Sequence, residues 1–155
     1  MSEYAKLHAE YALSTGKSLS DMTNLAQAAF DTRFEDRLAV IDLTAVMAHV
    51  AEDTGMEAQD LARAEQLYRQ FLTLKGRYPE MTVVPPKLVD TVWHTHITFT
   101  RQYMADCEIL FGAYLHHTPD VVGAEGMFES ITMPAYQAEF GVNLKAYGLQ
   151  GADCH

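Results

Sequence analysis

Side chains that bind metal ions or carry protons are concentrated in the second half of this sequence. The segment DTVWHTH, residues 90–96, is followed by Cys107 and by the adjacent pair His116 and His117. Four of the seven histidines lie in this window. Imidazole, carboxylate and thiolate groups are the usual protein ligands of zinc and iron. The window is therefore the first candidate for a functional site.

Helical spacing decides which of these groups can act together. Residues two apart on a helix point about 200° away from each other, whereas residues four apart are neighbours. Asp90 and His94 can therefore bind one metal ion together, whereas His94 and His96 cannot. Further ligands must come from elsewhere, and His116 and His117 are the natural candidates. We expect Asp90, His94, His116 and His117 to form a metal site suited to zinc or non-haem iron, with no catalytic residue assigned.

Other side chains of the window are candidates for lining the surrounding pocket or for hydrogen bonding to the metal ligands. Arg101 falls on the same polar edge as Asp90 and His94, where it could neutralise an anionic ligand. The others lie on the apolar face of the predicted helix, where packing is the commoner role. These four candidates are Trp93, His96, Tyr103 and Cys107.

Two alternatives compete with the metal site. The same polar residues could form a buried network that fixes helix packing in a non-enzymatic interaction module. A nucleophilic pair of Cys107 and His96 is less favoured. Eleven residues separate the two, which places them roughly 16 Å apart on a straight helix at about 1.5 Å rise per residue.

One long helix is predicted from Pro86 to Leu115, because Pro85 and Pro86 suit a helix start and apolar residues then recur at helical spacing. Its apolar face and the preceding helix supply the predicted core, which contains Phe71, Trp93, Phe99, Tyr103 and Phe111. On a straight helix His94 and His116 would lie roughly 33 Å apart. A shared site thus requires a bend, and whether the helix bends near Gly112 is not given by the sequence.

The remaining segments also favour helices. Helical periodicity predicts helices over residues 3–13, 21–30, 34–53, 54–75 and 125–140. Thr54 and Glu57 have capping-box spacing, the fourth helix is expected to end before Gly76, and Pro134 to interrupt the last one. Residues 81–84 are expected to be an extended connector, and residues 147–155 a loose tail. We predict an all-α fold with five to seven helices in a single domain, residues 1–155.

Composition excludes several classes of function. The 155 residues carry a formal net charge of −10, which disfavours nucleic-acid binding. Phosphate-binding loops and dinucleotide motifs are missing, so no nucleotide cofactor is expected. Neither a membrane span nor a signal segment is recognised, and two cysteines are too few for a disulfide scaffold. We expect a cytoplasmic protein whose partner is a small molecule or another protein.

A set of motifs in fixed order resembles the glycine-rich domain-containing protein-like family. They are YRQFLTL at residues 68–74, VP at 84–85, VDTVWHTHI at 89–97, Tyr103, DC at 106–107, FG at 111–112 and LHHTP at 115–119. The resemblance covers residues 68–119 well and extends more weakly to about residue 141. It implies an all-helical domain and no particular reaction. The expected function is therefore a small helical metal-binding domain, with catalysis on a small molecule left open.

Overall fold

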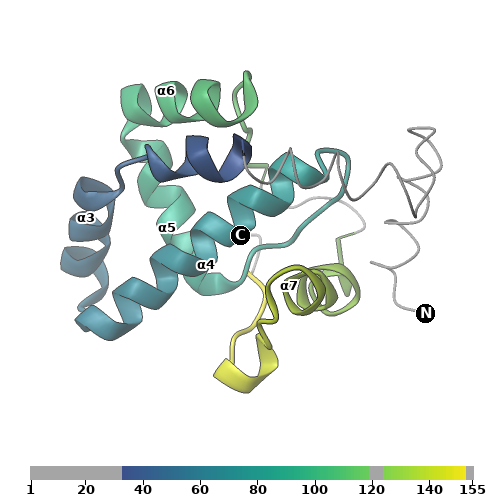
Figure 1. The fold of residues 1–155 in the computed structure, drawn as a ribbon. Helices are drawn as coiled ribbons and strands as arrows, with labels where there is room; N and C mark the ends of the chain where they lie inside the picture. The colour runs from purple at the N-terminus through teal and green to yellow at the C-terminus, as the bar shows by residue number, and fades with distance from the viewer. Residues whose placement is uncertain (1–32, 119–123, 153–155) are drawn as a thin grey trace.

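The computed structural model describes residues 33–118 and 124–152, so the helices expected over residues 3–13 and 21–30 lie outside the described residues. The fold within these ranges is helical and contains no strand, which confirms the all-α prediction (Figure 1). After a helical segment at residues 33–39, the helices are α3 (Thr44–Thr54), α4 (Ala58–Arg77), α5 (Lys87–Thr98), α6 (Thr100–Phe111), the π-helical turn η1 (Phe128–Thr132), α7 (Met133–Phe140) and the 3₁₀ turn η2 (Lys145–Tyr147).

Helix α4 is the central element, and it contacts α3, α5 and α7 (Figure 1). Apolar residues recur along one of its faces, as the sequence predicts, and Tyr68, Phe71 and Leu72 are buried there. The Phe71 ring packs on the Trp93 ring of α5, with centroids 4.9 Å apart. This contact anchors α5, the helix that carries the DTVWHTH segment.

The long helix predicted from Pro86 to Leu115 is instead two helices. The chain leaves helical geometry at Phe99, which has φ −81° and ψ 66° and separates α5 from α6. Two threonine hydroxyls donate to backbone carbonyls near this end of α5, Thr95 to Thr91 and Thr98 to Thr95. Such local bonds compete with regular helix hydrogen bonding. The break changes the direction of the chain, and α6 lies across the end of α5 and contacts it (Figure 1).

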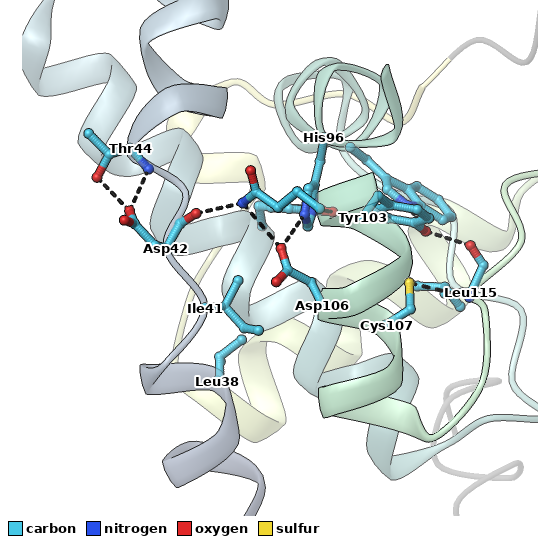
Figure 2. A network of polar contacts seen from close by, with 12 residues as sticks. Leu38, Ile41, Asp42, Thr44, His96, Tyr103, Asp106, Cys107 and Leu115 are labelled. Carbon is cyan, nitrogen blue, oxygen red and sulfur yellow. Dashed lines mark hydrogen bonds and ion pairs between the residues drawn. The ribbon is translucent and has the colours of Figure 1, made fainter. Parts of the chain in front are cut away.

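The helix predicted over residues 34–53 is also divided, at residues 40–43. The Asp42 carboxylate accepts hydrogen bonds from the backbone N–H of Thr44 at 3.0 Å and from its hydroxyl at 2.6 Å (Figure 2). The Arg69 guanidinium of α4 donates to the carbonyls of Leu38 and Ile41, both at 2.9 Å. These bonds satisfy backbone groups that a helix end leaves unpaired.

The boundaries of α4 differ from the prediction at both ends. Thr54 belongs to the end of α3, where its hydroxyl donates to the Val50 carbonyl, so it does not cap α4. Helix α4 also continues through Gly76 to Arg77. A Cβ atom at Gly76 would lie 2.7 Å from the Phe34 ring, so glycine serves close packing here and does not end the helix.

The C-terminal part follows the prediction in outline. The π-helical turn immediately precedes Pro134, whose missing N–H removes one regular helix bond. The end of the described chain, expected to be loose, is hydrogen-bonded: Lys87 N–H donates to the Gln150 carbonyl and Ala152 N–H to the Pro85 carbonyl, both at 2.9 Å. The connector at residues 81–84, expected to be extended, contains neither helix nor strand. Across the described ranges, no helix has the length and apolar character that crossing a membrane requires.

Candidate metal site

Asp90, His94 and His117 converge on one spot. One ligand atom from each lies within 4.8 Å of the other two. His117 Nε2 is 2.8 Å from Asp90 Oδ1, and His94 Nε2 is 3.4 Å from Asp90 Oδ2. The two imidazole rings lie side by side, with centroids 4.3 Å apart and planes tilted by 60°. A carboxylate and two imidazoles in this arrangement could hold a metal ion.

The first two groups are positioned by α5. Pro86 stands at the N-cap, so Asp90 lies in the first turn of the helix, where a negative charge is favoured by the helix dipole. His94 follows one turn later on the same edge, as its spacing predicts. Asp90 is half-buried and His94 is exposed, so the pair lies where the protein surface meets the interior.

The third group is brought in by the segment that follows α6. Gly112 adopts the left-handed conformation, with φ 66°, and ends α6. The Tyr103 hydroxyl then donates to the Leu115 carbonyl and accepts a hydrogen bond from Trp93 Nε1 at 2.9 Å. This bridge holds the returning segment against α5, with the His117 ring 4.1 Å from the Trp93 ring.

A pocket of about 230 Å³ opens beside the triad. Its walls come from the end of α4, the connector that follows α4, α5, residues 116–118, Ala124 and Ala152 of the docked C-terminal segment. Apolar side chains of Met81, Val83 and Val84 contribute to it. The three polar groups of the triad thus line a largely apolar hollow, as is typical of small-molecule sites.

His116 and Arg101 are placed differently from the triad. His116 lines the same pocket, but its ring is exposed and packs on Tyr114 with centroids 4.8 Å apart. Arg101 is exposed on α6 and does not line the pocket, because the break at Phe99 separates it from the edge that carries Asp90 and His94.

His96 takes part in a separate, buried network (Figure 2). Its Nε2 lies 2.8 Å from Asp106 Oδ2, and its Nδ1 lies 2.7 Å from the Tyr68 hydroxyl. The Gln102 amide bridges Asp106 to the Asp42 carbonyl, with bonds of 3.2 and 2.6 Å. The network joins α4, α5, α6 and the segment before α3, which is a structural role.

The proton positions in this network follow from its chemistry. An ionised carboxylate only accepts, so the bond to Asp106 requires the proton on His96 Nε2. His96 Nδ1 is then the acceptor and the Tyr68 hydroxyl the donor. Burial lowers the pKa of His96, although the hydrogen bond to Asp106 opposes the shift, and burial raises the pKa of Tyr68 well above its ordinary value. Both side chains are therefore neutral.

Cys107 is a buried thiol without a base beside it. Its sulfur accepts from the Leu115 N–H at 3.5 Å, and burial raises its pKa. His96 is bonded to Tyr68 and Asp106 and forms no hydrogen bond with Cys107. A nucleophile requires a lowered pKa or an adjacent base, so this geometry argues against the pair as a nucleophilic site.

Lys75 lines the pocket and was not among the residues selected from the sequence. It lies in the last turn of α4, where a basic residue is expected simply for the helix dipole. No local sequence pattern points to Lys75 as a pocket residue, since the connector that lines the pocket beside it has no regular periodicity.

Comparison with models of protein families identifies the family of this chain. Residues 42–130, more than half of the sequence, match the UCP032817-like family, and the chain belongs to it. The match contains all three residues of the triad. The resemblance to the glycine-rich domain-containing protein-like family was wrong, because the family found is a different one. No curated protein and no solved structure matches the chain.

Proposed function

We propose that this protein binds one metal ion through Asp90, His94 and His117. The observation that carries the proposal is the convergence of three ligand atoms, from two segments 27 residues apart, at the wall of a pocket. His116, on the same wall, is proposed as a further ligand that would have to turn away from Tyr114.

The spacing of the ligand atoms supports a mononuclear site. Tetrahedral ligands at about 2.0–2.1 Å from zinc lie about 3.3 Å from one another. The separation of 3.4 Å between His94 Nε2 and Asp90 Oδ2 matches this value. The shorter separation of 2.8 Å between His117 and Asp90 is a hydrogen bond whose proton a metal ion would replace.

The ligand set suits zinc or non-haem iron. Two imidazoles and one carboxylate hold catalytic zinc and non-haem iron in many proteins and leave coordination positions open. An open position facing a pocket gives water or a small molecule access to the metal. Metal-dependent chemistry on a small molecule is therefore the proposed activity, with the reaction unassigned.

The test is metal analysis of protein purified without an affinity tag and then exposed to zinc or iron. Wild-type protein should bind one equivalent and gain melting temperature, since a ligand at 100 times its Kd adds about 2.7 kcal/mol to the free energy of unfolding. His94→Ala and His117→Ala should lose metal uptake while the helical circular dichroism signal stays unchanged.

The chain offers a matched control in the His49 and Asp53 pair of α3. This pair has the same residue types at the same helical spacing, with His49 Nε2 3.3 Å from Asp53 Oδ2, but none of residues 33–118 and 124–152 supplies a third ligand there. His49→Ala should leave metal uptake unchanged. Equal uptake by wild type, His94→Ala and His117→Ala would contradict the proposal and favour a non-enzymatic interaction module.

A further inference from the structure

The pocket beside the triad is lined by a lysine as well as by the proposed metal ligands. Lys75 lines this pocket, half-buried in the last turn of α4. The pocket therefore brings an ammonium group and the Asp90, His94 and His117 group to the same hollow.

The Lys75 ammonium has no carboxylate partner in the part of the chain that the structure describes. Its Nζ donates one hydrogen bond, to the Met81 carbonyl at 3.3 Å, and none of the described residues forms an ion pair with it. Arg77, two residues later on the same helix turn, is paired with Glu139 at 2.7 Å. Glu80 also lines the pocket, but its side chain is exposed.

A desolvated ammonium that has only one carbonyl partner is unfavourable. Lysine carries three N–H donors, so two remain for a ligand. Burial lowers the pKa of Lys75, which is the expected effect of removing water without supplying a negative charge. An anion bound in the pocket would supply that charge.

We propose that the pocket binds a small organic acid whose carboxylate pairs with Lys75 while its other polar end reaches the metal position. This inference rests on the proposed metal site, because the second end of the molecule needs a partner there. The Met81, Val83 and Val84 side chains suit the carbon body of such a molecule. Pockets that bind drug-sized molecules have volumes of about 300 Å³ or more. This pocket has a volume of about 230 Å³, so its ligand is smaller.

Calorimetric titration with a series of dicarboxylates (malonate, succinate and glutarate) and with acetate tests the proposal, in zinc-loaded and in chelator-treated protein. Zinc-loaded wild type should bind one dicarboxylate at least tenfold more tightly than acetate. Lys75→Met should lose at least tenfold in affinity for that dicarboxylate while still binding one equivalent of zinc. Lys145→Met is the matched control, since Lys145 is exposed on η2 outside the pocket, and it should bind as wild type does.

The outcomes separate the two proposals. Zinc uptake with equal dicarboxylate affinity in wild type and Lys75→Met would overturn the role of Lys75 and leave the metal site standing. Failure of wild type to bind zinc would contradict the metal site. The Lys75 subsite is then decided in chelator-treated protein, where weaker binding by Lys75→Met supports it and equal binding overturns it. Circular dichroism of each variant checks that it is folded.

Discussion

The buried imidazole of His96 shows how one side chain can connect four segments. Each of its nitrogens has a partner, one on α4 and one on α6, and the partner on α6 is itself bridged to the segment before α3. Buried polar groups stabilise a fold only when every donor and acceptor is satisfied. Removing one member should therefore cost more than the net value of one hydrogen bond.

Tyr68→Phe tests this at the residue scale. The substitution removes only the hydroxyl and leaves His96 Nδ1 as a buried acceptor without a partner, which should lower the free energy of unfolding by about 1–3 kcal/mol. Urea denaturation followed by circular dichroism measures the change. Tyr147→Phe is the control, because Tyr147 is 51% exposed and loss of its hydroxyl should leave the free energy of unfolding nearly unchanged. Equal effects of the two substitutions would mean that the network contributes nothing specific.

The residue types of the site and its helical pair could be read from the sequence, but the tertiary contacts that complete the site could not. The spacing of Asp90 and His94 predicted their pairing, and the structure has that pair. The position of His117 depends on the hydrogen bonds of Tyr103, and that of Lys75 on an irregular connector. Both are tertiary features that no local pattern encodes.

At the scale of elements, the helix breaks account for most of the difference between expectation and structure. Helical periodicity runs through Phe99 without a glycine or proline to interrupt it, so the pattern predicted one helix. The break depends on threonine hydroxyl bonds and on the pairing of His96 with Asp106 across the bend. At Gly76 the opposite error occurred, since a residue typical of helix ends lies inside α4.

Gly76→Ala provides the test at this scale. In an open helix interior the substitution would stabilise by roughly 0.5–1 kcal/mol, because alanine is the better helix former. Here the new methyl group would meet the Phe34 ring at 2.7 Å, so we expect destabilisation of about 1–3 kcal/mol. Thermal or urea unfolding measures it. In a Phe34→Leu background the same substitution should cost less; an equal cost in both backgrounds would show that the Phe34 contact is not its cause.

For the molecule as a whole, the buried neutral His96 links folding to pH. Its pKa is lowered in the folded protein, whereas the unfolded chain has the ordinary value of about 6.5. Between these two values the unfolded state binds more protons, so the contribution to stability is complete above about pH 6.5 and declines as the pH falls below it.

The expected result is a decrease in the urea midpoint of wild-type protein from pH 7 to pH 5, measured by circular dichroism. His96→Gln removes the titrating group and should show a shallower decrease over the same interval, whatever its stability at pH 7. Parallel pH profiles for the two proteins would assign the acid sensitivity to other groups.

The position of Trp93 allows intrinsic tryptophan fluorescence to report on the pocket. The sequence contains one tryptophan, and its indole lines the pocket, lies 4.1 Å from the His117 ring by centroid and donates to Tyr103. All indole emission therefore originates at the pocket wall. A ligand that moves or charges His117 changes the surroundings of the only indole, so its arrival can be followed by intrinsic fluorescence without attaching a dye.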